Sequence, residues 1–336
     1  MVANANSISA EAQPVVSPSV CRNISGFWQR LLAFILDGII LGVVGFISGL
    51  LLFDFYAHLG GLGRLLGFCV ALIYFALLNS SIGKGQTIGK RIMKIEVVDK
   101  SGDHISPFRS FIRYTVIGVP FFLNGALIPL DLAVAPIGIL IGFTIFGIGG
   151  ATIYLYIFNR LTRQSLHDLI VGTFVTKISP KGSLNHVSVW RAHLVITGIW
   201  FIAVLGFSIF IPSLSNKGVF PNLFAVQKSI QSSGKVHAAT VFEGKSWTMG
   251  SYSKTETSYF HSNAILKERP IDYEALAKEI ALIVLSVHPE IESKDIVRIT
   301  LTYGYDIGIA RAWRRHSFQH SPNEWQKILG DAKFKI

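Results

Sequence analysis

Charged residues are scarce in this chain of 336 residues. Asp, Glu, Lys and Arg make up 15% of it, against roughly 25% in soluble domains, and half of the residues are hydrophobic. Cysteine is scarcer still. We expect Cys21 in an N-terminal tail and Cys69 inside a membrane helix, so the two have no plausible way to pair. These shortages argue against an ordinary soluble domain and against a disulfide framework.

The apolar residues are concentrated in runs that approach or exceed the length needed to cross a membrane, which is about 20 residues. The candidate transmembrane helices are Leu31–Phe53, Leu65–Asn79, Tyr114–Leu130, Val134–Phe158 and Leu194–Ile211. Pro120 and Pro129 predict a kink or an early end in the third of them. The sequence therefore predicts an α-helical polytopic membrane protein with about five transmembrane helices.

The distribution of basic residues predicts the orientation of the chain. Lys and Arg crowd the segments after the second and fourth runs, whereas the turns after the first and third carry only Arg64. By the positive-inside rule, the N-terminus and the basic segments face the cytoplasm, and the region after the fifth run lies outside. This bias explains much of the net charge of +11, so we expect contact with the bilayer and its anionic lipid headgroups and no nucleic-acid partner.

The region after the fifth run has the composition of a soluble domain. Asp272–Val287 is predicted to be an amphipathic helix capped by Asp272, and Asp295–Tyr303 alternates as a strand does, with a turn at Tyr303–Asp306 and a return strand at Ile307–Phe318. Ser321–Glu324 is a capping box. Further candidates are a helix at Phe220–Gln231 and strands at Ala238–Phe242 and Tyr252–Tyr259. These elements predict a small α+β domain.

The predicted division of the chain has four parts. Residues 1–25 form a disordered cytoplasmic tail, because Met1–Val20 has neither the basic nor the apolar region of a signal peptide. Residues 26–178 form a membrane domain of four helices and two basic cytoplasmic segments. Residues 179–213 hold a linker and the fifth helix, and residues 214–336 form the extracytoplasmic domain. A β-hairpin with its turn at Ser101–Gly102 is predicted in the first basic segment, and the two segments could pair as strands.

Asp37 lies inside the first apolar run, seven residues after Arg30. A carboxylate at such a depth costs roughly 2.5–3.5 kcal/mol on insertion scales. It could be a proton- or cation-binding group in a polar cavity, or a structural anchor that pairs with a base such as Arg30 or Arg113. The glycines at 38, 42, 45 and 49 predict close packing on this helix.

Asp168 follows His167 in the second basic segment. A metal site needs further His or Asp ligands at recognisable spacing, and none is present, so no metal or other cofactor is expected. We expect Asp168 to pair with an arginine, either Arg30 or Arg91. The predicted functional polar cluster is then Arg30, Asp37 and Asp168, with possible support from Arg91, Arg113 and His167.

Trp313, Arg314 and Arg315 stand together on a predicted strand, and Trp and Arg are favoured at protein interfaces. They are therefore candidates for binding a partner. No nucleophile–base pair and no carboxylate pair suggests catalysis, so we do not expect an enzyme.

Four blocks in order resemble the RDD family of bacterial membrane proteins, which is named for one arginine and two aspartates. The blocks are Phe27–Asp37, Gly85–Asp99, Pro107–Arg113 and Arg163–Thr173. The resemblance covers about residues 26–177, and the residues that carry over are Arg30, Asp37 and Asp168. It implies a multi-pass protein of a bacterial inner or internal membrane. Some similar proteins are implicated in sodium/proton exchange.

Two functions remain open at this point. The chain could be a membrane scaffold or assembly factor whose exported C-terminal domain binds a partner. Alternatively, it could transport an ion or small solute, by cation/proton exchange, using Asp37. The large appended domain favours the first, and the resemblance favours the second.

Overall fold

The computed structural model describes residues 23–128, 136–178, 184, 188–215, 220–249 and 254–330. The predicted tail at Met1–Val20, Cys21 and Pro129 lie outside these residues. Cys69 has a free thiol on the surface of a membrane helix.

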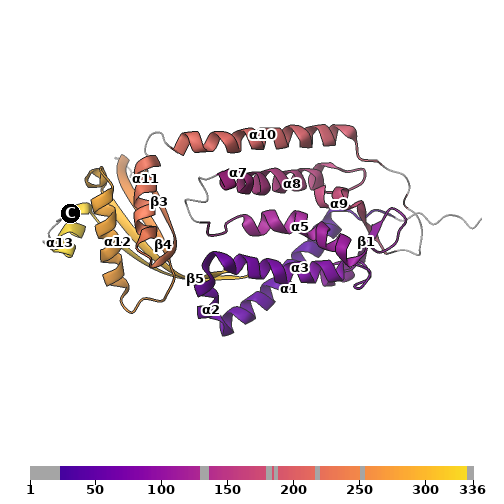
Figure 1. The fold of residues 1–336 in the computed structure, drawn as a ribbon, viewed down its shortest axis with the longest axis horizontal. Helices are drawn as coiled ribbons and strands as arrows, with labels where there is room; N and C mark the ends of the chain where they lie inside the picture. The colour runs from indigo at the N-terminus through magenta and orange to yellow at the C-terminus, as the bar shows by residue number, and fades with distance from the viewer. Residues whose placement is uncertain are drawn as a thin grey trace, which may run out of the picture.

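In the described part of the chain, five helical segments run between the two ends of the molecule. Figure 1 shows their arrangement. They are α1 (Phe27–Leu51); α2 (Phe53–Leu59), η1 (Gly60–Leu62) and α3 (Gly63–Leu78) together; α5 (Pro107–Leu123); α7 (Pro136–Gly142), a π-helical stretch η2 (Phe143–Ile148) and α8 (Gly149–Phe158) together; and α10 (Arg191–Ser215). The segments alternate in direction, so that the C-terminal domain lies at the end opposite to α9 and β1 (Figure 1).

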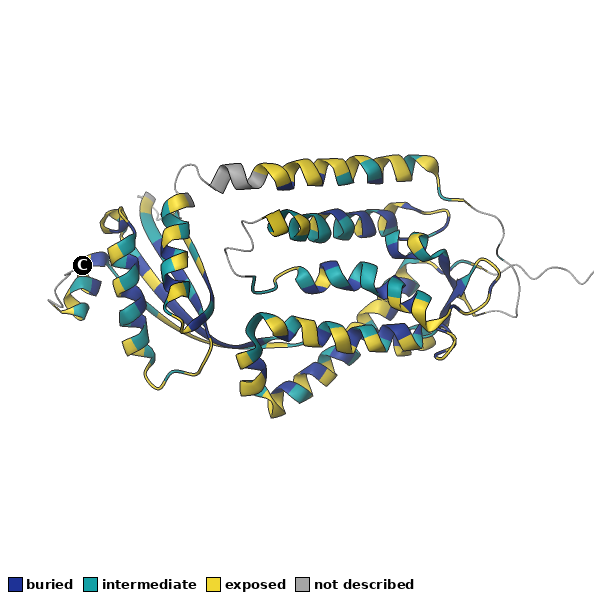
Figure 2. Ribbon diagram, viewed as in Figure 1, coloured by how far each residue is buried: buried dark blue, intermediate teal, exposed yellow. Residues whose placement is uncertain are grey.

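Four of these segments are long and apolar enough to cross a membrane. They are Phe27–Leu51, Phe53–Leu78, Pro136–Phe158 and Arg191–Phe210. Many of their large apolar residues are exposed. Exposed positions are most continuous along α10 (Figure 2). The chain is therefore a multi-pass membrane protein by the composition of its helices.

The remaining segment, α5, differs from the predicted third span. Ser106 caps it by accepting a hydrogen bond from the backbone N–H of Arg109, and Pro107 occupies its first turn, so it begins seven residues before Tyr114. It ends at Leu123, soon after Pro120, and is 17 residues long. Its early start places Arg113 inside the helix, beside α9.

A small polar layer closes the end of the bundle that holds the basic segments. It contains α4 (Ile88–Ile92), α9 (Leu166–Val171) and two antiparallel strands, β1 (Ile95–Asp99) and β2 (Thr173–Lys177). The predicted pairing of the two basic segments is confirmed. The predicted β-hairpin around Ser101–Gly102 is wrong: the chain does turn there, but the hydrogen-bonded partner of β1 is β2, and residues 103–106 form no strand.

The C-terminal domain is a four-stranded sheet with helices on one face (Figure 1). Its strands, in spatial order, are β3 (Val236–Met249), β4 (Lys254–Leu266), β5 (Ile296–Asp306) and β6 (Arg311–His320). Its helices are α11 (Phe220–Ser232), α12 (Tyr273–Val287), η3 (Ile291–Ser293) and α13 (Pro322–Leu329). β4 and β5 are parallel, with α12 in the crossover, and the other pairs are antiparallel.

Several predictions for this domain are confirmed by its local chemistry. Asp272 caps α12 by accepting two backbone hydrogen bonds, and Ser321 forms the capping box of α13 with Glu324. The predicted turn at Tyr303–Asp306 is wrong. That segment stays in β5, and the chain reverses at residues 307–310 instead.

The β5–β6 turn at residues 307–310 packs between the membrane helices α1 and α3, at positions where these helices carry glycine. On α1, a Cβ at Gly45 would press on Ala310, and one at Gly49 would overlap the Tyr305 hydroxyl; on α3, one at Gly67 would overlap the carbonyl oxygen of Ile307. These glycines therefore make room for the turn of the C-terminal domain, a role that the prediction of close packing on α1 did not include.

Alanine at Gly67 should loosen the docking of the C-terminal domain. Its methyl group has no room beside Ile307, and overpacking of this kind costs roughly 1–3 kcal/mol. We expect Gly67→Ala to lower the melting temperature of the protein in detergent and to speed its limited proteolysis. Gly198→Ala is the matched control, because nothing lies within 4 Å of the added methyl group. Equal behaviour of the two variants would contradict the seating of the turn.

Candidate functional site

Asp168 lies at the centre of a buried ion-pair network. It is in the first turn of α9, which Ser165 caps, and its side chain is fully buried. Arg30 of α1 donates to its Oδ2 at 2.7 Å, and Arg113 of α5 donates to its Oδ1 at 2.7 and 3.0 Å. Thr173 donates to Oδ1 at 3.1 Å. One carboxylate thus joins two membrane-domain helices to the polar layer.

The electrostatics of this network favour an ionised carboxylate. Burial alone would raise the pKa of Asp168, but Arg113 and Arg30 outweigh it and hold that pKa well below its usual range. Two guanidinium groups face one carboxylate, which leaves an excess of positive charge. The predicted pairing of Asp168 with Arg30 is confirmed. The other predicted partner, Arg91, is exposed, and Arg113 takes that place.

Asp37 forms a second buried node, and no arginine among the described residues bonds to it. It accepts hydrogen bonds from the Tyr74 hydroxyl at 2.6 Å, the Thr87 hydroxyl at 2.6 Å and the Gly89 backbone N–H at 2.8 Å. The alternative of an anchor that pairs with Arg30 or Arg113 is wrong in its partners, because neutral donors bond to Asp37 in the described part of the chain. A side chain at Gly89 would overlap the Ala33 carbonyl, so glycine allows α4 to reach α1.

Lys90 links the two nodes, and sequence reasoning did not single it out. Its Nζ donates to Asn79 Oδ1 at 2.8 Å, and both Asp37 and Asp168 act on its charge. Part of its side chain is exposed, yet desolvation, reinforced by Arg113, lowers the pKa of Lys90 to about 7. The sequence did contain a local indication of the helix that carries Lys90. Thr87 is a residue type that often caps helices, and it caps the short helix α4.

Two buried polar groups near Asp168 have no hydrogen-bond partner among the described residues. They are Nδ1 of His167 and Oγ1 of Thr152. His167 Nε2 lies 3.6 Å from Asp168 Oδ2, but burial lowers the pKa of His167 to about 3, so the imidazole is neutral. Among the described residues, no group of three or more His, Cys, Asp or Glu side chains could hold a metal ion.

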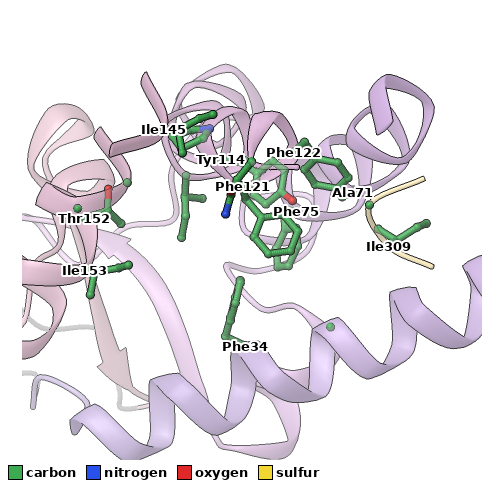
Figure 3. Close-up of a pocket in the computed structure, with 18 of the residues that line it drawn as sticks. Phe34, Ala71, Phe75, Tyr114, Phe121, Phe122, Ile145, Thr152, Ile153 and Ile309 are labelled. Atoms are coloured by element: carbon green, nitrogen blue, oxygen red, sulfur yellow. The ribbon is translucent and has the colours of Figure 1, made fainter. Parts of the chain in front are cut away.

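Two cavities lie within the bundle, and the smaller of them lies beside the polar layer. The larger has a volume of about 740 Å³ and is mainly apolar; Figure 3 shows Phe34 of α1 facing Phe75 and Tyr114 across it. The smaller has a volume of about 340 Å³ and is lined by Arg30 and Arg113, among others. Asp37 lines neither cavity.

The structure separates the three predicted partner-binding residues. Arg314 pairs in register with Tyr303 and lies 4.8 Å above the Phe53 ring of α2, so it serves contacts within the chain. Trp313 and Arg315 lie on the opposite face of the sheet, away from the helices. Of the three, Trp313 and Arg315 remain candidates for contact with another protein.

The low pKa of Lys90 predicts a pH dependence of stability. In the unfolded chain Lys90 binds its proton up to about pH 10.4, whereas in the folded protein it releases the proton near pH 7. The unfolded state therefore binds more protons between these values, and stability should rise with pH by up to about 1.4 kcal/mol per pH unit. Unfolding in detergent from pH 7 to 9 should show this rise, and Lys90→Met should flatten it. An equal slope in Lys90→Met would contradict the assignment, and Lys94→Met, at an exposed site, is the control.

Part of the chain is similar to a known family of proteins. The model of the RDD family matches residues 24–172. An uncharacterized protein of Bacillus subtilis (strain 168), YckC, is 29% identical over 156 residues, which cover 46% of this chain and 86% of that protein. No solved structure matches the chain significantly. Residues 24–172 therefore form an RDD family domain within a multi-pass membrane protein.

Proposed function

We propose that this protein is a membrane-anchored interaction factor, in which the RDD family domain holds the C-terminal domain in a fixed orientation for a protein partner. The observation that carries the proposal is the direct packing of the C-terminal domain on the membrane helices. Phe53 and Ala57 of α2 belong to the apolar core of that domain. A domain tethered by a flexible linker would not share a core with the membrane part.

Polar contacts between the two parts support a fixed orientation. Arg64 pairs with Asp306 at 2.7 Å and also donates to the carbonyls of Phe122 and Asn124. The Tyr303 hydroxyl donates to Asp54 at 2.8 Å. Arg64, the lone basic residue of the predicted outer turns, thus has a role at the junction.

The uncovered face of the sheet is the proposed binding surface. We define it by Arg298, Trp313, Arg315, Ser317 and Gln319 of β5 and β6, which point away from the helices. Its central charges are two arginines, and most of these side chains are exposed. Arginine and tryptophan are enriched at interface hot spots, so the surface suits an acidic segment of another protein.

The arrangement of the helices supports an extracytoplasmic position for this surface. If α5 is a fifth crossing, the C-terminal domain lies on the side opposite to the basic segments, which the positive-inside rule assigns to the cytoplasm. In a bacterium this would be the outer side of the inner or an internal membrane. The surface would then meet extracytoplasmic proteins.

Cation exchange through Asp37 receives less support from the geometry. Its carboxylate is fully buried, accepts three hydrogen bonds from neutral donors and lines neither bundle cavity. A carboxylate that is held in this way is suited to locking α4 against α1.

Cross-linking from the uncovered face tests the proposed function. A photoreactive amino acid at Arg315 of the full-length protein in cells should give a specific product, and Trp313→Ala in the same chain should reduce its yield at least about fivefold, as expected for loss of a hot spot. The same probe at Glu274, an exposed residue of α12, is the matched control. No product at Arg315, or equal products at both positions, would contradict the proposal.

A further inference from the structure

The two cavities of the bundle form one path with a cationic end. Six residues line both of them: Phe34, Phe75, Tyr114, Ile117, Thr152 and Ile153. We propose that this path is a binding site for one anionic lipid, with an acyl chain in the larger cavity and the headgroup beside Arg30, Lys90 and Arg113. This site is independent of the proposed interaction surface.

The dimensions of the path match one leaflet of a bilayer. It follows α1 from Arg30 to Leu41, which is about 16 Å at a rise of about 1.5 Å per residue. One leaflet contributes about half of a hydrocarbon core of about 30 Å. The larger cavity, at about 740 Å³, also lies within the range of about 300–1,000 Å³ that is usual for ligand sites.

The positive charge around the smaller cavity favours an anionic ligand there. Arg30, Lys90 and Arg113 line the smaller cavity, and no Asp or Glu is among the described residues that line it. Arg30 and Arg113 share one carboxylate, Asp168, so their positive charge is not fully balanced. A phosphate group would add the charge-assisted hydrogen bonds that arginine and lysine form readily.

Two unpaired polar atoms mark the same place. Within the part of the chain that the structure describes, Thr152 Oγ1 and His167 Nδ1 are buried without a hydrogen-bond partner, and both residues line the smaller cavity. Burying a polar group without a partner is unfavourable, because the group gives up its hydrogen bonds to water. The glycerol and ester oxygens of a lipid, and a headgroup hydroxyl, can satisfy such groups where a hydrocarbon chain alone cannot.

One wall of the path is open to the membrane, and the far end of the path is closed. Phe34 and Ile153 line the path and are 46% and 62% exposed, so part of its wall faces the lipid around the bundle. At the far end, Gly308 and Ile309 of the β5–β6 turn close the larger cavity. The path is thus accessible from the membrane on the side of the basic segments and closed by the C-terminal domain on the other.

Lipid retention by the purified full-length protein tests this site. The protein is incubated in detergent with phosphatidylglycerol or phosphatidylcholine, washed, and examined by native mass spectrometry. We expect one retained phosphatidylglycerol per protein and a preference over phosphatidylcholine of about tenfold or more, as charge-assisted contacts would give. Equal retention of the two lipids would overturn the proposal.

Variants locate the binding. Ile153→Trp narrows the path, and Lys90→Gln removes an amine whose protonated form a bound phosphate would favour. Each should reduce retention of phosphatidylglycerol at least about fivefold. Ile202→Trp, at a lipid-exposed position of α10 outside the path, is the matched control and should retain it. Gly149→Leu, on the wall of the larger cavity, replaces Ile153→Trp if that variant does not fold. Unchanged retention of phosphatidylglycerol in folded variants of the residues that line the path would overturn the proposal. Binding of glycerol 3-phosphate as tightly as the lipid would also overturn it, because the acyl chain would then contribute nothing.

Discussion

The ion-pair network of Asp168 is the interaction on which the rest of the membrane domain depends. Its carboxylate holds Arg30 of α1 and Arg113 of α5 at hydrogen-bond distance inside a buried layer. Removing one partner of such a network leaves an uncompensated buried charge, which typically costs 3–5 kcal/mol. The network therefore sets the positions of α1 and α5 at one end of the bundle, and with them the walls of the cavities between these helices.

Two further constraints act with this network. Asp37 fixes α4 against α1 through Thr87 and Gly89. As a result, Lys90 of α4 lines the smaller cavity. At the opposite end, the β5–β6 turn is seated between α1 and α3 and determines how the C-terminal domain lies on the bundle. The proposed lipid site and the proposed interaction surface thus occupy opposite ends of one connected framework.

The sequence predicted what depends on local patterns. Four of the apolar runs correspond to helices that can cross a membrane, and the caps at Asp272 and Ser321 placed α12 and α13. The pairing of Arg30 with Asp168 followed from motifs that resemble a family. The donors to Asp37 were not predicted, because they come from separate elements whose approach depends on packing. The seating of the β5–β6 turn was missed for the same reason, since it joins segments more than 200 residues apart, as Arg64 and Asp306 illustrate.

A double-mutant cycle between Arg113 and Asp168 tests the central claim most directly. The free energy of unfolding in detergent is measured for the wild type, Arg113→Gln, Asp168→Asn and the double variant. If the buried pair sets the positions of the helices, each single variant is strongly destabilised and the double variant recovers a coupling energy on the order of 2 kcal/mol. A coupling energy near zero, with additive losses, would contradict the central role of this network.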